Sequence, residues 1–419
     1  RADMTDIERQ GMSAKKAAAV LMTAGTTVKN AALCAIAKAL EDGEQEILEA
    51  NEKDMALAKE SGMRPALLDR LRLDSKRIRA MADGVREVAA LRDPVGRVLS
   101  MEKRPNGLLI GRKTVPLGVI AIIYEARPNV TVDAAVLCLK AGNAVILRGG
   151  KEAFYSNNAL TNIMRRAIRE AGLPEDCVSL VQDTSRQSVN DILSLTGYVD
   201  VLIPRGGAGL IRHVVENAKV PVIQTGVGNC HVYVEKTADL DMAASIIYNA
   251  KCSRPSVCNA AETLLVDEDI AEAFLPKAKA LLDQKNTELR GCDKTRAILG
   301  ESVVPATEED YYTEFGDYIL AVKVVSGLDE AIAHINKYGS SHSEAIVTEN
   351  YTAAQRFLDE IDAAAVYVNA STRFTDGGEF GMGAEIGIST QKMHARGPMG
   401  LEQLTTTKFI IYGNGQVRV

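Results

Sequence analysis

Short apolar runs alternate with helical segments over residues 117–224. The runs are rich in β-branched residues, and stretches of about ten or more residues with helical spacing separate them. Strands connected by helices form βαβ units and a parallel sheet, so the pattern predicts an α/β fold with a ligand site beyond the carboxyl ends of the strands. The expected strands are 118–124, 144–147, 179–181, 199–203 and 220–223, and the expected helices are 132–141, 157–171 and 188–195.

The regions on either side predict different structures. Residues 13–91 have apolar residues at helical spacing and predict a layer of three or four helices after a poorly ordered start at 1–10. Residues 95–116 predict a β-hairpin, because Asn106 and Gly107 form a strong turn signal. The exposed edge of this hairpin needs a partner, which the β-prone run 405–412 can supply, including from a second subunit. We therefore expect a homo-oligomer, a dimer or higher.

A second α/β unit begins at His231 and predicts a mixed sheet. The glycine-dense residues 371–400 predict a long functional loop. The chain of 419 residues is long enough for roughly two or three domains. The expected strands of the second unit are 261–266, 320–325, 345–347 and 365–369, and its expected helices are 270–284 and 328–338.

Charge and cysteine usage exclude several classes of function. The net charge of −6, from 49 basic and 55 acidic residues, argues against nucleic acid or an anionic membrane as the main partner. No apolar run reaches the roughly 18 residues of a membrane span. The seven cysteines are irregularly spaced and no signal peptide is recognised, which indicates reduced thiols in a cytoplasmic protein. No His lies at the spacing of a zinc site, so no metal is expected.

Two predicted strands end in glycine loops that carry cations, at residues 148–151 and 204–207. The glycines allow a ligand to approach the backbone, and the second loop opens a helix whose N-terminus can receive phosphate. Either loop alone is more often a plain turn, but two at strand ends favour a nucleotide site. The candidate cofactor-binding residues in these loops are Arg148, Gly149, Gly150, Lys151, Pro204, Arg205, Gly206 and Gly207.

Cys258 follows Arg254 and Pro255 in a turn rich in small residues, and an apolar β-prone run comes after it. A thiolate presented in this way can attack an electrophilic carbonyl carbon. The alternative is that Cys258 is a small buried hydrophobic residue, as many lone cysteines are.

Four features in chain order resemble the aldehyde dehydrogenase superfamily over about residues 95–412. They are Pro116–Ile120 followed by Arg127–Pro128, the segment LKAGNAVIL at 139–147, Cys258 with its flanking spacing, and Glu314–Phe315–Gly316. Residues 325–346, 124–135 and 377–390 are similar to a narrower branch that reduces an acyl phosphate. This resemblance implies NADPH-dependent reduction of L-glutamyl 5-phosphate to L-glutamate 5-semialdehyde and phosphate, the second step of L-proline biosynthesis. It also raises channelling of the acyl phosphate from a glutamate kinase.

The resemblance implies that Cys258 forms a thioester and then a thiohemiacetal. The oxyanion donors would be the Cys258 backbone N–H and a side-chain amide, for which Asn129 and Asn259 are both candidates because Ala126 stands at the usual asparagine position. Thr225 stands where hydrolytic relatives have a glutamate base. Without that base water is a poor nucleophile, so phosphate is expected to leave or attack.

The resemblance also places the cofactor and the substrate. Glu314, followed by Phe315, would hold the nicotinamide ribose, and Arg148 stands at the ribose-binding lysine position. Lys151 replaces an acid that contacts the ribose hydroxyls in NAD-preferring relatives, which favours NADP(H) because a cation can pair with the 2′-phosphate. The candidates for binding the substrate's carboxylate and phosphate are Arg127, Arg254 and Arg373, although arginines are more often surface residues.

We therefore predict an aldehyde-dehydrogenase-like fold with two α/β domains that have parallel-type sheets and a small β-hairpin element. The dinucleotide-binding domain is placed at 1–96 and 117–230, the catalytic domain at 231–403, and the oligomerisation element at 97–116 and 404–419. Three alternatives stay open: a hydrolytic aldehyde dehydrogenase, a cysteine acyltransferase or hydrolase that needs a His partner for Cys258, and a non-catalytic scaffold in which Cys258 is dispensable.

Overall fold

The computed structural model describes residues 3–419, which divide into two compact units. Unit 1 extends to Thr225 and also includes 381–387 and 399–419, and unit 2 consists of 226–380 and 388–398. The predicted catalytic domain thus contains segments that belong to unit 1. The Ile386 N–H donates to the Met399 carbonyl at 2.8 Å and links the two segments, and Asn143 Nδ2 donates to the Leu404 carbonyl at 2.8 Å and attaches them to the rest of unit 1. The predicted division into three functional domains stays a prediction. None of the described helices has the length and hydropathy to cross a lipid bilayer.

Unit 1 contains a four-stranded parallel sheet in the order β5-β4-β3-β6. Its strands are β3 (Val119–Tyr124), β4 (Ala144–Arg148), β5 (Val178–Leu180) and β6 (Val201–Arg205). This confirms the predicted parallel α/β arrangement and four of its five strands. The expected strand at 220–223 is wrong, because only a single bridge joins Leu202 to Val222. Pro221 lies beside that bridge and has no N–H with which to extend a ladder.

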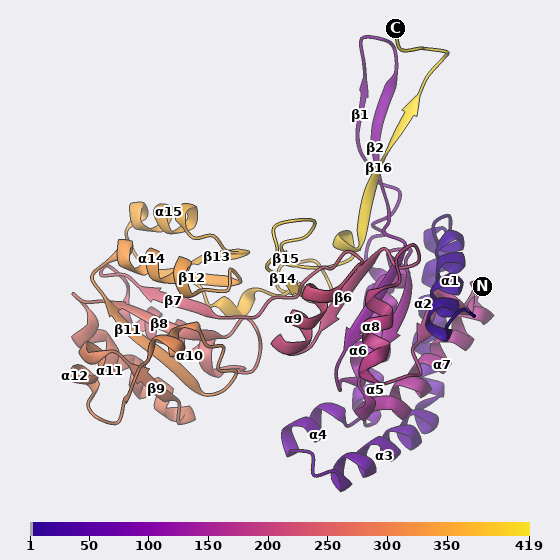
Figure 1. Cartoon of the computed structure of the whole chain (residues 1–419). Helices are drawn as coiled ribbons and strands as arrows, with labels where there is room; N and C mark the ends of the chain where they lie inside the picture. Colours follow the sequence, from indigo (N-terminus) through magenta and orange to yellow (C-terminus); the bar gives the residue numbers. More distant parts are fainter. Residues whose placement is uncertain (1–2) are drawn as a thin grey trace. The chain divides into compact units, whose positions relative to one another are not determined.

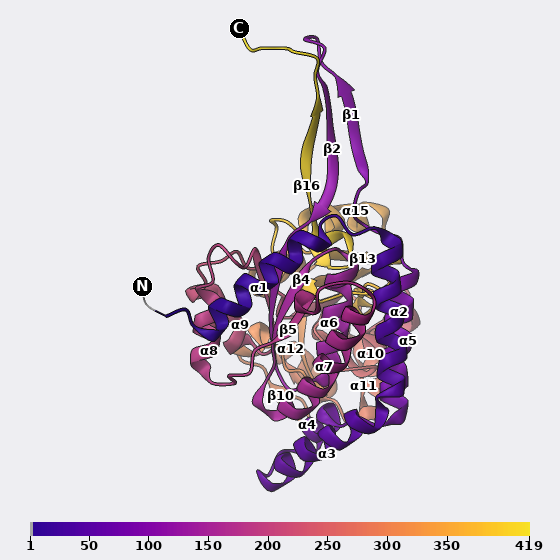
Figure 2. The ribbon, with the colours of Figure 1, turned by 90° about the vertical axis from the view of Figure 1, so that its right-hand side faces the viewer.

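Helices cover both faces of this sheet (Figure 2). They are α1 (Asp6–Leu21), α2 (Thr26–Asp42), α3 (Glu44–Glu60), α4 (Pro65–Leu71), α5 (Ser75–Ala90), α6 (Pro128–Lys140), α7 (Phe154–Glu170), α8 (Arg186–Leu193) and α9 (Ala208–Asn217), with 3-10 turns η1 (Lys151–Ala153), η2 (Glu175–Cys177) and η5 (Glu402–Leu404). Helices α6 and α7 pack on the sheet, and α2, α3 and α5 pack outside them.

Two expectations about the N-terminal helices are corrected. The N-terminal region forms five helices instead of three or four, because Asp74 caps a further helix, α5, beyond the boundaries at Gly25, Gly43 and the positive-φ Gly62. Residues 6–10, expected to be poorly ordered, form the first turns of α1, because Thr5 and Glu8 complete a capping box there. Residues 1–2 lie outside the described part of the chain.

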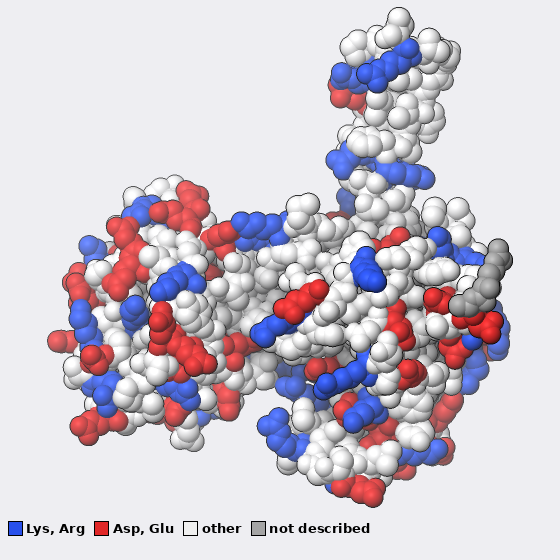
Figure 3. Space-filling view, in the orientation of Figure 1, with Lys and Arg blue, Asp and Glu red and all other residues white. Residues whose placement is uncertain are grey.

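A three-stranded antiparallel arm projects from unit 1 (Figures 1 and 2). It consists of β1 (Val98–Lys103), β2 (Leu109–Pro116) and β16 (Thr405–Tyr412). The hairpin of β1 and β2 is confirmed. Strand β16 pairs with β2 along its whole length within the same chain, so that edge of β2 needs no second subunit. Phe409 is 65% exposed and Ile411 58%. Basic side chains are visible at two levels of the arm (Figure 3).

Unit 2 contains a seven-stranded sheet in the order β10-β9-β11-β8-β7-β12-β13. Its strands are β7 (Cys230–Val234), β8 (Ala261–Asp267), β9 (Glu288–Gly291), β10 (Val304–Pro305), β11 (Ile319–Val325), β12 (Ser343–Val347) and β13 (Ala365–Val368), beside the separate pair β14 (Ile388–Ser389) and β15 (Gly397–Pro398). Every pairing of the large sheet is parallel, so the expected mixed sheet is wrong. The helices between its strands are long enough to return the chain to the same end each time.

Both faces of the unit 2 sheet are buried under helices (Figure 1). They are α10 (Leu240–Cys252), α11 (Ala271–Leu282), α12 (Asp293–Leu299), α13 (Glu308–Tyr312), α14 (Leu328–Tyr338) and α15 (Tyr351–Glu360), with 3-10 turns η3 (Asp283–Lys285) and η4 (Thr372–Phe374). Side chains alternate between two cores, so that Val232 and Val234 face one and Tyr233 the other. Burial on both faces explains why these strands are continuous apolar runs.

Candidate active site

The two glycine loops of unit 1 flank the carboxyl end of β3. Strand β3 pairs with β4 on one side, where Ile123 lies opposite Arg148, and with β6 on the other, where Tyr124 lies opposite Arg205. The chain leaves β3 in one direction through β4 and β5 and returns on its other side as β6. Such a switch point is where open parallel sheets bind ligands. The structure therefore brings the predicted loops 148–151 and 204–207 to one place.

The second loop leaves space for a ligand at the start of α9. Gly207 caps this helix without any side-chain hydrogen bond, and a Cβ added to Gly207 or Gly209 would meet only open space. Gly206 is more confined, because its added Cβ would approach the Glu125 carboxyl group at 2.8 Å. The Thr225 hydroxyl donates to the Pro204 carbonyl at 2.9 Å and holds the loop from behind. Free N–H groups at the first turn make this end of α9 suitable for phosphate.

The two cations of the first loop have different surroundings. The Arg148 guanidinium donates to the carbonyls of Thr184 at 2.7 Å and Ser185 at 3.0 Å, so it fixes the turn before α8. Burial lowers the pKa of Arg148 below its ordinary value. Lys151 is exposed, and no hydrogen bond or ion pair of its ammonium group is found among residues 3–419. Of the two, Lys151 is the cation more available to a ligand phosphate.

Cys258 lies in unit 2, in the loop 253–260 between α10 and β8, and is partly exposed. Its backbone is held from two sides. A Cβ added to Gly228 would collide with the Cys258 carbonyl, so only glycine allows this approach. The Cys230 thiol donates to the same carbonyl at 3.3 Å. The thiol is therefore carried by a loop whose backbone is fixed on the buried sheet.

The two candidate oxyanion amides lie in different units. Asn129 is exposed at the first turn of α6, with its amide 3.4 Å from the Asp133 carboxylate. Asn259 is buried next to Cys258, and its Nδ2 donates to the carbonyls of Arg373 at 3.2 Å and Thr375 at 3.0 Å. With both amide protons engaged in this way, Asn259 has little left to offer an oxyanion. The oxyanion role of either residue stays a prediction.

The structure brings two of the three predicted substrate arginines together near the thiol. Arg373 donates to Asn259 Oδ1 at 2.6 Å and to Ser253 Oγ at 3.0 Å. Burial, and then the nearby charge of Arg254, lower the pKa of Arg373, whereas Asp376 and Cys258 oppose that shift. Arg373, Arg254 and Cys258 are thus close enough to interact electrostatically. Arg127 belongs to unit 1, where it precedes α6.

Glu314 and Phe315 also belong to unit 2 and lie close to this loop. Burial raises the pKa of Glu314, while a hydrogen bond from the Gly228 backbone and the charge of Lys251 oppose the increase. The Phe315 N–H donates to Glu262 Oε2 at 3.0 Å. Gly228 therefore contacts both the predicted nucleophile and the predicted ribose ligand.

Sequence reasoning missed three residues of this site: Gly228, Lys251 and Glu262. The signal for Gly228 is its place in the small-residue segment 225–228, in which close backbone approach is possible. The signal for Lys251 and Glu262 was a charge at each end of the Cys258 loop beside apolar residues. These two charges predict a buried ion pair only if the end of the helix before the loop lies against the start of the strand after it. That arrangement is set by the packing of the helix on the sheet.

A buried histidine lies near Cys230 and not in the loop itself. His342 Nδ1 hydrogen-bonds Ser343 Oγ at 2.8 Å and lies 3.8 Å from Cys230 Sγ. Burial lowers the pKa of His342 to about 4, so this ring is neutral at pH 7. A weakly basic ring that faces Cys230 and not Cys258 gives little support to the histidine-activated acyltransferase alternative.

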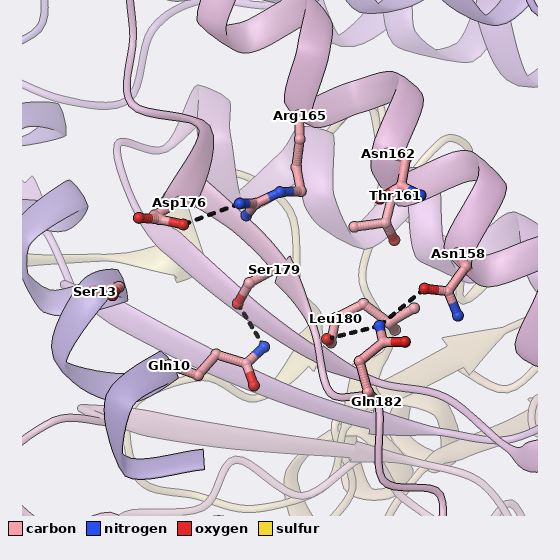
Figure 4. Close-up of a pocket in the computed structure, with 10 residues that line it drawn as sticks. All are labelled: Gln10, Ser13, Asn158, Thr161, Asn162, Arg165, Asp176, Ser179, Leu180 and Gln182. Atoms are coloured by element: carbon pink, nitrogen blue, oxygen red, sulfur yellow. Dashed lines mark hydrogen bonds and ion pairs between the residues drawn. The ribbon is translucent and has the colours of Figure 1, made fainter. Parts of the chain in front are cut away.

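A separate polar pocket lies at the β5 edge of unit 1, between α1 and α7 (Figure 4). Its side chains bond largely to one another: Gln10 donates to Ser179 at 2.9 Å, and Arg165 donates to Asp176 at 3.1 Å. None of the predicted site residues lines this pocket. It is therefore distinct from the switch point.

Comparison with known proteins identifies the family. The model of the aldehyde dehydrogenase family matches residues 1–290 and 311–410. The gamma-glutamyl phosphate reductase of Carboxydothermus hydrogenoformans is 63% identical over 99% of this chain and 100% of its own length. That of Moorella thermoacetica is 63% identical over 99% of both chains. The chain belongs to the aldehyde dehydrogenase family, in its gamma-glutamyl phosphate reductase group. Membership of this family implies a nicotinamide cofactor.

Solved structures agree with this assignment to the aldehyde dehydrogenase family. The crystal structure of the gamma-glutamyl phosphate reductase from Thermotoga maritima has a TM-score of 0.97 and 51% identity, and covers 99% of this chain and 100% of its own. An acetylating aldehyde dehydrogenase from Geobacillus thermoglucosidasius has a TM-score of 0.71 at 18% identity, covering 99% of this chain and 100% of its own. The second likeness shows the fold alone, and the predicted aldehyde-dehydrogenase-like fold is confirmed.

Proposed function

We propose that this enzyme reduces L-glutamyl 5-phosphate to L-glutamate 5-semialdehyde and phosphate with NADPH, the second step of L-proline biosynthesis. The observation that carries the proposal is the grouping of Cys258 with Arg254 and Arg373 in a member of the gamma-glutamyl phosphate reductase group. A thiol beside two guanidinium groups suits a substrate that carries an acyl carbon and an anionic leaving group.

The chemistry begins with the thiolate of Cys258. Its sulfur bonds to the acyl carbon, the bond from that carbon to the phosphate oxygen breaks, and phosphate leaves with the electron pair. Arg254 and Arg373 stabilise the negative charge on the departing phosphate. When bound, the reduced nicotinamide supplies the hydride that reduces the resulting thioester to a thiohemiacetal. The carbon–sulfur bond then breaks, the aldehyde leaves and Cys258 is restored.

Phosphate, and not water, is the proposed partner of the thioester in the reverse direction. Hydrolysis needs a general base, and the position of that base in hydrolytic relatives is taken here by Thr225. The Thr225 hydroxyl is a donor to the Pro204 carbonyl at 2.9 Å and is not a base. This supports the phosphorylating reaction over the hydrolytic alternative.

The residues of unit 1 fit a phosphorylated dinucleotide. We propose that the loops 148–151 and 204–207 receive it at the switch point, with its phosphates at the uncapped start of α9. Lys151 is the cation proposed for the 2′-phosphate of NADP(H), and Glu314 is proposed to bind the nicotinamide ribose. The residues Arg148, Gly149, Gly150, Pro204, Arg205, Gly206, Gly207 and Phe315 complete the proposed cofactor set.

We further propose a cytoplasmic homo-oligomer. The arm supports oligomerisation, because it exposes apolar side chains such as Phe409 and Ile411. All seven cysteines are free thiols, which fits a reducing compartment. Transfer of the unstable acyl phosphate from a glutamate kinase would shorten its exposure to water. Light scattering of the purified protein, alone and with that kinase, tests both associations.

One assay tests the reaction. The protein is incubated with glutamate 5-semialdehyde and NADP, and NADPH formation is followed with and without phosphate. We expect formation that depends on phosphate and is lost in Cys258→Ala. Equal rates without phosphate would favour the hydrolytic alternative, and an unchanged rate in Cys258→Ala would favour the scaffold.

A further inference from the structure

A buried ion pair closes the base of the Cys258 loop. Lys251 is the penultimate residue of α10, and Glu262 is the second residue of β8. Lys251 Nζ lies 3.1 Å from Glu262 Oε2, and both side chains are 0% exposed. The pair therefore joins the two ends of the segment that carries the thiol.

The same carboxylate holds a second segment. Glu262 Oε2 accepts the Phe315 N–H at 3.0 Å, while Glu262 Oε1 has no hydrogen-bond partner among the described residues. Arg290 lies over the Phe315 ring, 5.2 Å from its centroid. Glu262 thus holds the Phe315 backbone, and Arg290 covers the Phe315 ring.

Stability alone gives little reason for this pair. The desolvation of two buried charges offsets most of their attraction, and buried pairs can often be replaced by apolar residues with little loss of stability. Burial raises the pKa of Glu262 to about 7, with the charge and hydrogen bond of Lys251 opposing that increase. Burial of the Glu262 carboxylate is unfavourable, yet one of its oxygens interacts with both Lys251 and the Phe315 N–H. This indicates that Glu262 has a role in positioning the Glu314–Phe315 segment.

We propose that Glu262, kept in place by Lys251, is a positioning residue that sets the Glu314–Phe315 backbone relative to the Cys258 loop. This inference rests on the proposed function, in which Glu314 binds the nicotinamide ribose. Glu262 acts through the Phe315 N–H and does not touch the cofactor. Its loss is expected to weaken cofactor binding while the thiol stays reactive.

The variant Lys251→Met/Glu262→Leu separates positioning from stability, because it removes the hydrogen bond without leaving an unpaired charge. NADPH binding is measured by fluorescence titration, and thiol reactivity by the rate of Cys258 alkylation. We expect the melting temperature to stay near that of the wild type and the alkylation rate to stay unchanged. The Kd for NADPH should rise about 10-fold, because the Glu314–Phe315 backbone is no longer held in position. Glu262→Gln keeps an acceptor for the Phe315 N–H and should retain the wild-type Kd.

A double-mutant cycle with Glu314→Gln tests whether Glu262 acts through Glu314. In the Glu314→Gln background the further effect of Lys251→Met/Glu262→Leu on Kd should nearly vanish. Additive effects, or a wild-type Kd in Lys251→Met/Glu262→Leu, overturn the inference. The control Glu344→Gln alters a buried His231–Glu344 pair in the same unit and should lower stability without changing Kd.

The outcomes distinguish this inference from the proposed function. A wild-type protein that binds NADPH but shows no phosphate-dependent activity overturns the proposed reaction, while the binding data still decide the role of Glu262. If Lys251→Met/Glu262→Leu does not fold, hydrogen exchange of the Phe315 amide in the wild type carries the test. Protection comparable with that of strand β8 supports the inference, and exchange as fast as in an exposed loop overturns it.

Discussion

Asn259 and Arg373 hold each other by reciprocal hydrogen bonds. Arg373 Nη1 donates to Asn259 Oδ1 at 2.6 Å, and Asn259 Nδ2 donates to the Arg373 carbonyl at 3.2 Å. Asn259 follows the predicted nucleophile, and Arg373 belongs to η4, so this exchange fixes a guanidinium group next to the thiol loop. The arrangement favours Asn259 as the residue that positions Arg373, and not as an oxyanion donor.

Replacement of Asn259 distinguishes these two roles. We expect Asn259→Ala to raise the KM for phosphate about 10-fold with a smaller change in kcat, because Arg373 loses its fixed position. Arg373→Lys should give the same pattern, since an ammonium lacks the planar fork with which the guanidinium reaches Asn259 and Ser253 from two separate nitrogen atoms. Steady-state kinetics in the oxidising direction measures both constants. A fall in kcat of about 100-fold or more with unchanged KM would instead identify Asn259 as an oxyanion donor.

Cofactor choice is expected to depend on Lys151. The variant Lys151→Glu places a carboxylate where the 2′-phosphate is proposed to bind, so the KM for NADPH should rise about 10- to 100-fold while that for NADH changes little. The ratio of kcat/KM for the two cofactors measures the effect. Lys59→Glu changes another exposed lysine, in the last turn of α3, and serves as the control. An unchanged ratio in Lys151→Glu would show that Lys151 of the wild type is a solvated cation without a role in cofactor choice.

Gly228 is expected to tolerate no side chain. A Cβ at this position would collide with the Cys258 carbonyl, and the Gly228 backbone also bonds Glu314. Gly228→Ala should therefore lower the melting temperature and reduce activity by about 100-fold or more, since the thiol and its neighbours are displaced. Gly84→Ala is the matched control, because its Cβ would meet open space within α5 and alanine favours a helix. Wild-type activity in Gly228→Ala would show that the loop is not held as described.

Most of the fold was predictable because the sequence pattern is local. Apolar runs at strand spacing placed β3, β4, β6, β8, β11 and β12 within a few residues, and Asn106–Gly107 predicted the turn of the arm hairpin. The run 405–412 was also a candidate partner for that hairpin, and β16 does pair with β2; the sequence left open whether this happens within one chain or between two, because the two strands lie far apart along the chain. Period and turn signals do not determine which distant strands pair, or whether a sheet is mixed or parallel.

The candidate site was predictable to the extent that it consists of strand ends and a distinctive turn. Arg254, Cys258 and Glu314 are predicted from their places in the family's motifs, and the structure brings all three to the Cys258 loop or its neighbourhood in unit 2, while their roles stay predictions. The hydrogen bonds that occupy the side chains of Asn259 and Arg148 could not be predicted from the sequence. Their acceptors are backbone carbonyl groups of distant segments such as 373–375 and 184–185. Those contacts exist only after the loops pack. Sequence therefore indicates which residue types gather at this loop better than it indicates the hydrogen-bond partners of each one.

Acid sensitivity is expected to depend on His342. Burial lowers its pKa from the ordinary 6.5 to about 4, and the groups beside it are Cys230 and Ser343. Between these pH values the unfolded chain binds the proton more tightly, so the free energy of unfolding falls as pH drops below 6.5 and levels off below about 4. The full contribution at neutral pH is roughly 3 kcal/mol.

His342→Asn should remove this part of the pH dependence. Urea unfolding at several pH values between 7 and 4 is expected to give a shallower slope of the unfolding free energy against pH than in the wild type. His334, whose pKa burial lowers to about 2, contributes in the same direction to both proteins and leaves a residual slope. His213→Asn alters an exposed histidine on α9 and serves as the control for replacing a histidine by asparagine. Parallel curves for His342→Asn and the wild type would show that His342 does not titrate differently in the folded and unfolded chains.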